Sequence, residues 1–122
     1  LALNPTCHHN NPRLMELAQK FAETPFRPGC HSENRLFYLW GHSYEFDNDQ
    51  NWDRIEAFAA YMGGRDDVWY ATNIELYDYV KAYEALHTSV DNRMVHNPSS
   101  IDVWFWEAGQ IHCIHGGQTL SL

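Results

Sequence analysis

The residue best placed to do chemistry is His42. It follows the apolar run of residues 36–40, which has the length of a strand, after Gly41, which lets the backbone turn tightly. An imidazole exchanges a proton near neutral pH, so His42 could act as a general acid or base. Alternatively, it only caps the strand end through a backbone hydrogen bond. Its position alone leaves both interpretations open.

Glu45 lies three residues after His42. Its carboxylate could orient the imidazole or accept a hydrogen bond from a substrate hydroxyl. It could also belong to a solvated acidic loop with Asp47 and Asp49. The sequence favours this second interpretation, because charged loop residues are usually exposed.

His8 and His9 form the other pair of candidate site residues, directly after Cys7. Two adjacent histidines on a strand cannot easily point at one ion, although one could bind while the other packs. Zinc sites use three or four ligands, and the chain has no His-x-x-x-His pair on a helix. We therefore predict no metal ligands in this chain.

The remaining candidates have simpler interpretations. Thr72-Asn73-Ile74-Glu75 matches a capping box, with Thr72 as N-cap and Glu75 at N3. Trp104 and Trp106 could stack on a sugar, but alternating aromatic residues in a strand more often pack. The other histidines are predicted to lie in loops or hairpins: His31, His87, His96, His112 and His115.

Composition excludes several classes of function. The formal net charge of −8 repels phosphate backbones and anionic lipids, so neither nucleic acid nor a membrane surface is an expected partner. No apolar run is long enough to span a bilayer. There is no GxSxG motif, glycine-rich phosphate loop or Cys/His nucleophile pattern. Three widely spaced cysteines favour free thiols in a reducing compartment, which predicts a cytoplasmic protein.

The helices and strands that must position these residues are predicted from the spacing of apolar residues and from the residues that end helices and strands. Strands are predicted at residues 1–3, 36–40 and 68–71, and helices from about Asn10 to Glu23, over Trp52–Met62 and from Thr72 to about Leu86. Two hairpins are predicted after that, with turns at 91–93 and 107–109, and a last strand at 119–122.

Strands that alternate with helices predict an α/β fold with a parallel sheet and right-handed crossovers. Sites in such folds lie at the carboxyl ends of the strands, so His8, His9, His42 and Glu45 are expected to face one cleft. The predicted domains are residues 1–86 and a β-hairpin appendage at 87–122.

Three segments at compatible distances carry a family resemblance. The segments are Cys7-His8-His9-Asn10, residues 37–46 and residues 66–73. On these segments the chain resembles the C-terminal part of polysaccharide deacetylases of the carbohydrate esterase family 4 type, and the likeness extends to Asn97-Pro98. It is most specific at Leu39-x-x-His42, which is similar to the family's last motif.

The resemblance implies a partial, distorted (β/α) barrel with a small antiparallel β appendage at its C-terminus. It implies a metal-dependent hydrolase that removes acetyl groups from N-acetylated sugars, with His42 protonating the leaving amine. His8, His9 and Glu45 would contact the carbohydrate substrate. The divalent metal, expected to be zinc, would have its ligands outside this chain.

The chain begins Leu1-Ala2-Leu3, without methionine and within a predicted strand, as a cut piece would. Three parallel strands would also leave both sheet edges open. An N-terminal barrel segment or a partner chain is therefore expected to complete the enzyme. The alternative function is a non-catalytic carbohydrate-binding module, or a structural half-barrel that needs a partner.

Overall fold

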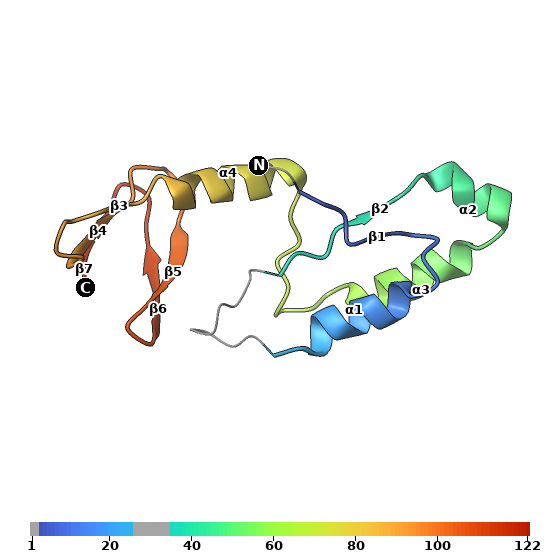
Figure 1. Cartoon of the computed structure of the whole chain (residues 1–122). Helices are drawn as coiled ribbons and strands as arrows, with labels where there is room; N and C mark the ends of the chain where they lie inside the picture. The colour runs from blue at the N-terminus through green and yellow to red at the C-terminus, as the bar shows by residue number, and fades with distance from the viewer. Residues whose placement is uncertain (1–2, 26–34) are drawn as a thin grey trace. The chain divides into compact units, whose positions relative to one another are not determined.

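The computed structural model describes residues 3–25 and 35–122, which form two compact units that divide between Val68 and Trp69. Figure 1 shows the elements of each unit. The predicted domains 1–86 and 87–122 stay a prediction. The predictions for Leu1, Ala2, Cys30 and His31 lie outside the described residues.

The described residues of the first unit form two very short strands and three helices. Its elements are β1 (Cys7–His8), α1 (Leu14–Glu23), β2 (Leu39–Trp40), α2 (Ser43–Asp49) and α3 (Trp52–Met62). The helix end at Glu23 and the bounds of α3 agree with the prediction. However, residues 45–49, predicted as a loop, belong to α2, which begins after His42 and ends where Gln50 adopts φ 49°.

The strands β1 and β2 pair in parallel, with Cys7 opposite Leu39 and His8 opposite Trp40. Helices α1 and α3 pack against each other, and Figure 1 shows them side by side. The Phe37 ring lies 5.6 Å from that of Phe21 and 5.5 Å from that of Phe58, measured between centroids. This aromatic contact joins both helices to the segment that leads into β2.

The second unit contains one helix and five strands. Its elements are α4 (Asn73–Glu84), β3 (His87–Thr88), β4 (Met94–His96), β5 (Val103–Glu107), β6 (Gln110–Ile114) and β7 (Thr119–Ser121). The strands form an antiparallel sheet in the order β3-β4-β7 and a separate hairpin of β5 and β6. Both predicted hairpins and the last strand are therefore confirmed.

The core of this unit consists of Ala82, Val95, Val103 and Ile114, which are almost fully buried. The predicted capping box opens α4, because the Thr72 N–H donates to Glu75 Oε2 over 2.7 Å while Thr72 Oγ accepts from the Glu75 N–H. Thr72 and Glu75 are thus occupied as a helix cap.

The predicted fold class is wrong in its main feature. Among the described residues the only parallel pairing is the β1–β2 pair, and no barrel is closed. No strand forms at residues 68–71, and only Leu39 and Trp40 of residues 36–40 pair as a strand. An apolar run forms a strand only where a neighbour accepts its backbone hydrogen bonds. The described chain is instead a mixed α/β structure with four helices and small separate sheets.

Candidate functional site

The parallel register of β1 and β2 assembles the candidate site in the first unit. Because both strands run the same way, the residues that follow them emerge at the same edge. The His9 N–H donates to the Trp40 carbonyl over 2.9 Å, which continues the ladder by one residue. The first strand was predicted to end before Cys7. In the structure, His8 is the last residue of β1 and His9 follows it.

Gly41 is needed for the close approach of His9. Its φ is +152°, and a Cβ at this position would lie 1.8 Å from His9 Cδ2. Only glycine leaves room for the ring there, and glycine also adopts this backbone angle without strain. The sequence suggested a tight turn at Gly41, and the structure shows that the missing side chain matters as well.

Glu45 is held at the N-terminus of α2 by the backbone of His42. The His42 N–H donates to Glu45 Oε2 over 2.9 Å, and the Glu45 N–H donates to the His42 carbonyl over 3.1 Å. A carboxylate in the first turn of a helix satisfies a free N–H group and interacts favourably with the helix dipole. Glu45 is therefore fixed in place, and the favoured interpretation of a solvated loop residue does not hold.

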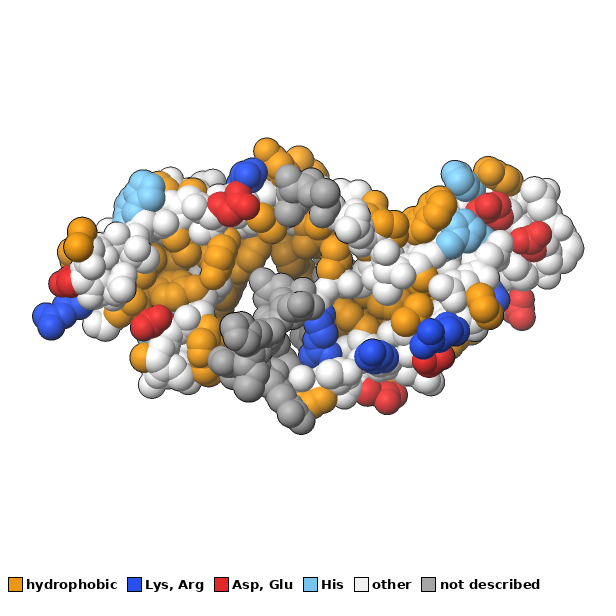
Figure 2. Space-filling model, in the orientation of Figure 1, with side chains coloured by type: hydrophobic (Ala, Val, Ile, Leu, Met, Phe, Trp, Pro, Cys, Tyr) orange, Lys and Arg blue, Asp and Glu red, His pale blue; other side chains and the backbone are white. Residues whose placement is uncertain are grey.

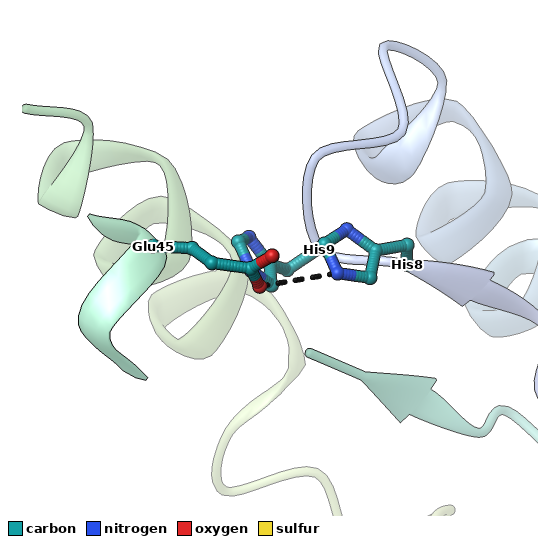
Figure 3. A group of neighbouring side chains, drawn as sticks. All are labelled: His8, His9 and Glu45. Carbon is teal, nitrogen blue, oxygen red and sulfur yellow. Dashed lines mark hydrogen bonds and ion pairs between the residues drawn. The ribbon is translucent and has the colours of Figure 1, made fainter. Parts of the chain in front are cut away.

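Three imidazoles surround one oxygen of Glu45. His9 Nε2 lies 2.7 Å from Oε2, His8 Nε2 lies 3.2 Å from it, and His42 Nδ1 lies 3.4 Å from it. Figure 3 shows His8, His9 and Glu45, with the carboxylate of Glu45 directed at the histidines. All four predicted site residues, His8, His9, His42 and Glu45, thus come together.

These contacts lower the pKa of Glu45 to about 2. The hydrogen bond from His9 is the largest cause, followed by the backbone N–H of His42, while partial desolvation acts in the opposite direction. Glu45 is therefore a carboxylate at any physiological pH. It can orient the rings and stabilise positive charge on them.

The two adjacent histidines differ in burial. His9 is only 2% exposed, and its ring packs in a tilted arrangement against that of Phe46, with centroids 4.2 Å apart. Its Nδ1 is buried without a hydrogen-bond partner among the described residues. His8 is partly exposed, with its ring edge against Trp40. His9 is therefore a structural support for Glu45, and His8 is accessible to a ligand.

His42 has the exposure that proton transfer to a ligand requires. Its side chain is 55% exposed, and no described residue hydrogen-bonds to its Nε2. The ring stacks on Tyr44, with centroids 5.2 Å apart, and meets Trp40 edge-on at 6.3 Å. Both aromatic side chains are themselves exposed. In Figure 2, histidine, acidic and hydrophobic side chains lie together over this end of the unit.

His8, His9 and Glu45 also each offer one metal-ligand atom within 4.8 Å of the others. However, Nδ1 of His8 accepts a hydrogen bond from the Asn10 N–H over 3.1 Å, so the ring proton is on Nε2. Coordination through Nε2 would move that proton to Nδ1, where it would face the Asn10 N–H. The cluster therefore fits hydrogen bonding to Glu45 better than metal coordination, and we assign no metal to it.

Sequence reasoning missed Arg54. Its Nε donates to the His9 carbonyl over 2.9 Å, and its Nη2 donates to the Asn11 carbonyl. Arg54 lies in α3, far along the chain from His9, so no local pattern indicates this contact. Trp40 and Tyr44 were not predicted either, although both lie within two residues of His42 in the sequence.

Comparisons with protein-family models, curated proteins and solved structures find no match for this chain. Among the described residues, no helix is long and apolar enough to cross a bilayer.

Proposed function

We propose that this chain is part of a metal-dependent hydrolase that removes acetyl groups from N-acetylated sugars, with His42 as the general acid. The observation that carries the proposal is the convergence of His8, His9 and His42 on Glu45 at the edge of the parallel pair. The resemblance of residues 37–46 to the last motif of polysaccharide deacetylases supplies the reaction class.

The arrangement suits protonation of a leaving amine. Amide hydrolysis stalls unless the departing nitrogen receives a proton, because an amine anion is a very poor leaving group. Glu45 engages His42 through Nδ1, which leaves Nε2 directed to an accessible position.

The other residues of the cluster hold this acid in position and contact the sugar. His9 is buried and fixes Glu45, whereas the ring of His8 is partly exposed beside Trp40 and can pack against a bound sugar. Trp40 and Tyr44 expose aromatic surface beside His42, on which the apolar face of a pyranose can pack. The substrate class, an N-acetylated sugar or polysaccharide, fits this combination.

The expected divalent cation, with zinc favoured, has its ligands outside this chain. When bound, it polarises the amide carbonyl and strengthens water as a nucleophile. A further segment or a partner chain that supplies these ligands must therefore be present for turnover. A cytoplasmic location remains part of the proposal, because Cys7 and Cys113 are free thiols.

The test is acetate release from N-acetylglucosamine oligomers by this chain joined to the segment that supplies the metal ligands. His42→Gln should lower kcat about 10²–10⁴-fold with little change in KM, because it removes a proton donor and not a binding group. His87→Gln, at an exposed histidine of β3, is the matched control. Full turnover in His42→Gln would contradict the proposed role.

A second candidate is carbohydrate binding without catalysis, favoured by the exposure of Trp104 and Trp106 on β5. Oligosaccharide titrations of the chain alone, followed by NMR, separate the two functions. Binding that Trp104→Ala and Trp106→Ala abolish, with no turnover in the completed protein, would favour this candidate. Binding that Trp40→Ala weakens would favour the hydrolase.

A further inference from the structure

The open end of the β5–β6 hairpin brings together three side chains that no step of the proposed hydrolysis uses. Asp102, Cys113 and His115 each offer one metal-ligand atom, and these atoms all lie within 4.8 Å of one another. All three belong to the second unit, so the cluster is independent of the His42 site.

The register of the hairpin explains why the three side chains meet. Val103 pairs with Ile114, and Asp102 and His115 are the residues next to that pair. Cys113 lies two residues before His115, and side chains two apart on a strand share a face. Val103 and Ile114 point into the core, so the three polar side chains are on the opposite, outer face.

Backbone contacts hold two of these residues before any ligand binds. Asp102 Oδ1 accepts from the Gly116 N–H over 3.2 Å, and the His115 N–H donates to Gln118 Oε1 over 2.8 Å. Gly116 lies so close to the Ser100 backbone that a Cβ would contact it at 2.7 Å. Asp102 Oδ2 lies 2.9 Å from His115 Nδ1, and this contact lowers the pKa of Asp102.

We propose that Asp102, Cys113 and His115 form a binding site for a zinc-class divalent metal ion. A carboxylate oxygen, a thiolate sulfur and an imidazole nitrogen are all established zinc ligands. Tetrahedral zinc places such atoms about 3.3–3.7 Å apart, which small side-chain rotations can reach from the separations seen here. Three protein ligands leave the fourth position to water, and the exposed outer face admits it.

Proton placement distinguishes this cluster from His8, His9 and Glu45. When an ion replaces the proton at His115 Nδ1, the ring proton moves to Nε2, to which no described residue hydrogen-bonds. That position opens to solvent, because the His115 side chain is 68% exposed. At His8 the equivalent shift would place the ring proton on Nδ1, where it would face the Asn10 N–H, so two donors would meet without an acceptor. The hairpin cluster can therefore bind an ion without losing a buried hydrogen bond.

The experiment titrates the whole chain, stripped with a chelator, with Zn²⁺ by calorimetry and with Co²⁺ by absorbance. We expect one bound ion per chain, release of protons on binding, and a thiolate-to-cobalt charge-transfer band. Cys113→Ser should abolish that band. Cys113→Ser and His115→Gln should each weaken Zn²⁺ binding about 10–100-fold or more.

Two controls decide where the ion binds. His112→Gln changes the adjacent histidine, which faces the other way and stacks on Phe105, and it should leave the affinity unchanged. Glu45→Gln removes the central carboxylate of the other cluster and should also have no effect. Absence of a one-to-one complex would overturn the proposal, as would affinity lost in Glu45→Gln and kept in His115→Gln. Circular dichroism of each variant confirms that it folds.

Discussion

A single carboxylate oxygen organises the candidate site at the scale of residues. Oε2 of Glu45 lies within hydrogen-bond distance of His9 Nε2, His8 Nε2 and the backbone N–H of His42. The His42 ring is slightly farther away. The charge on Glu45 is thus compensated by several dipoles rather than by one cation. Since His9 is buried and His42 is exposed, the carboxylate links the protein interior to the accessible ring.

The lowered pKa of Glu45 makes part of the folding free energy depend on pH. The pKa falls from 4.5 to about 2 on folding, so the ionised form is favoured in the folded state. Its stabilising contribution is therefore complete above about pH 4.5 and is lost as the pH falls towards about 2. The difference in unfolding free energy between the wild type and Glu45→Gln should shrink over this interval.

Urea unfolding of both proteins across that interval measures the effect. Glu56→Gln, at an exposed position of α3, controls for the general loss of a negative charge. A difference between wild type and Glu45→Gln that stays constant down to pH about 2 would show that Glu45 does not hold these hydrogen bonds.

Residue types and positions in the sequence identified His8, His9, His42 and Glu45 as candidates, and the structure brings all four together. The prediction of a solvated loop at Glu45 was wrong, because it was inferred from the acidic neighbours of a residue that belongs to α2. Arg54 could not be found, since its bond to the His9 carbonyl joins residues 45 positions apart. Such contacts leave no local pattern.

At the scale of elements, the short parallel pairing of two residues in β1 with two in β2 positions the entire candidate site. β1 and β2 are short, and Gly41 lets the His9 ring lie directly over the chain that leaves β2. Helix α2 then begins at once and presents Glu45 in its first turn. The site thus depends more on this glycine turn and helix start than on an extended sheet.

Gly41→Ala should destabilise the first unit by about 1–3 kcal/mol, the usual range for overpacking. The new Cβ would overlap the His9 ring and displace it from Glu45. Urea unfolding gives the loss of stability, and the NMR signals of His9 report its displacement.

Gly64→Ala is the matched control for this variant. Gly64 also has a positive φ, of +68°, but no atom lies within 4 Å of the added Cβ. It should therefore show backbone strain alone. Equal effects of the two variants on the His9 signals would contradict the steric role of Gly41.

Helices were predicted better than parallel strands. Apolar spacing, proline and the capping box are local signals, and they identified α1, α3 and α4 closely. A strand needs a partner, and the partner of residues 68–71 was only assumed. The antiparallel hairpins were predicted correctly because both strands and the turn are contiguous in sequence.

At the scale of the whole molecule, charge constrains the partners. Sixteen acidic and eight basic residues produce the net charge of −8, which repels polyanions. We expect no complex with duplex DNA at about physiological salt, where non-specific binding requires clustered cations. Fluorescence anisotropy of a labelled duplex measures this. A saturable rise in anisotropy at micromolar protein would contradict the expectation.

The sequence by itself determined helices α1, α3 and α4, the hairpins and the residue types of the candidate site, because these depend on neighbours in the chain. Only the tertiary structure decided that the parallel strands form a single pair within the described ranges, that Glu45 lies on a helix, and that Asp102, Cys113 and His115 share a face. Pairing between distant segments depends on backbone hydrogen bonds and burial of the whole fold. These long-range contributions to the folding free energy cannot be read from the order of the residues alone.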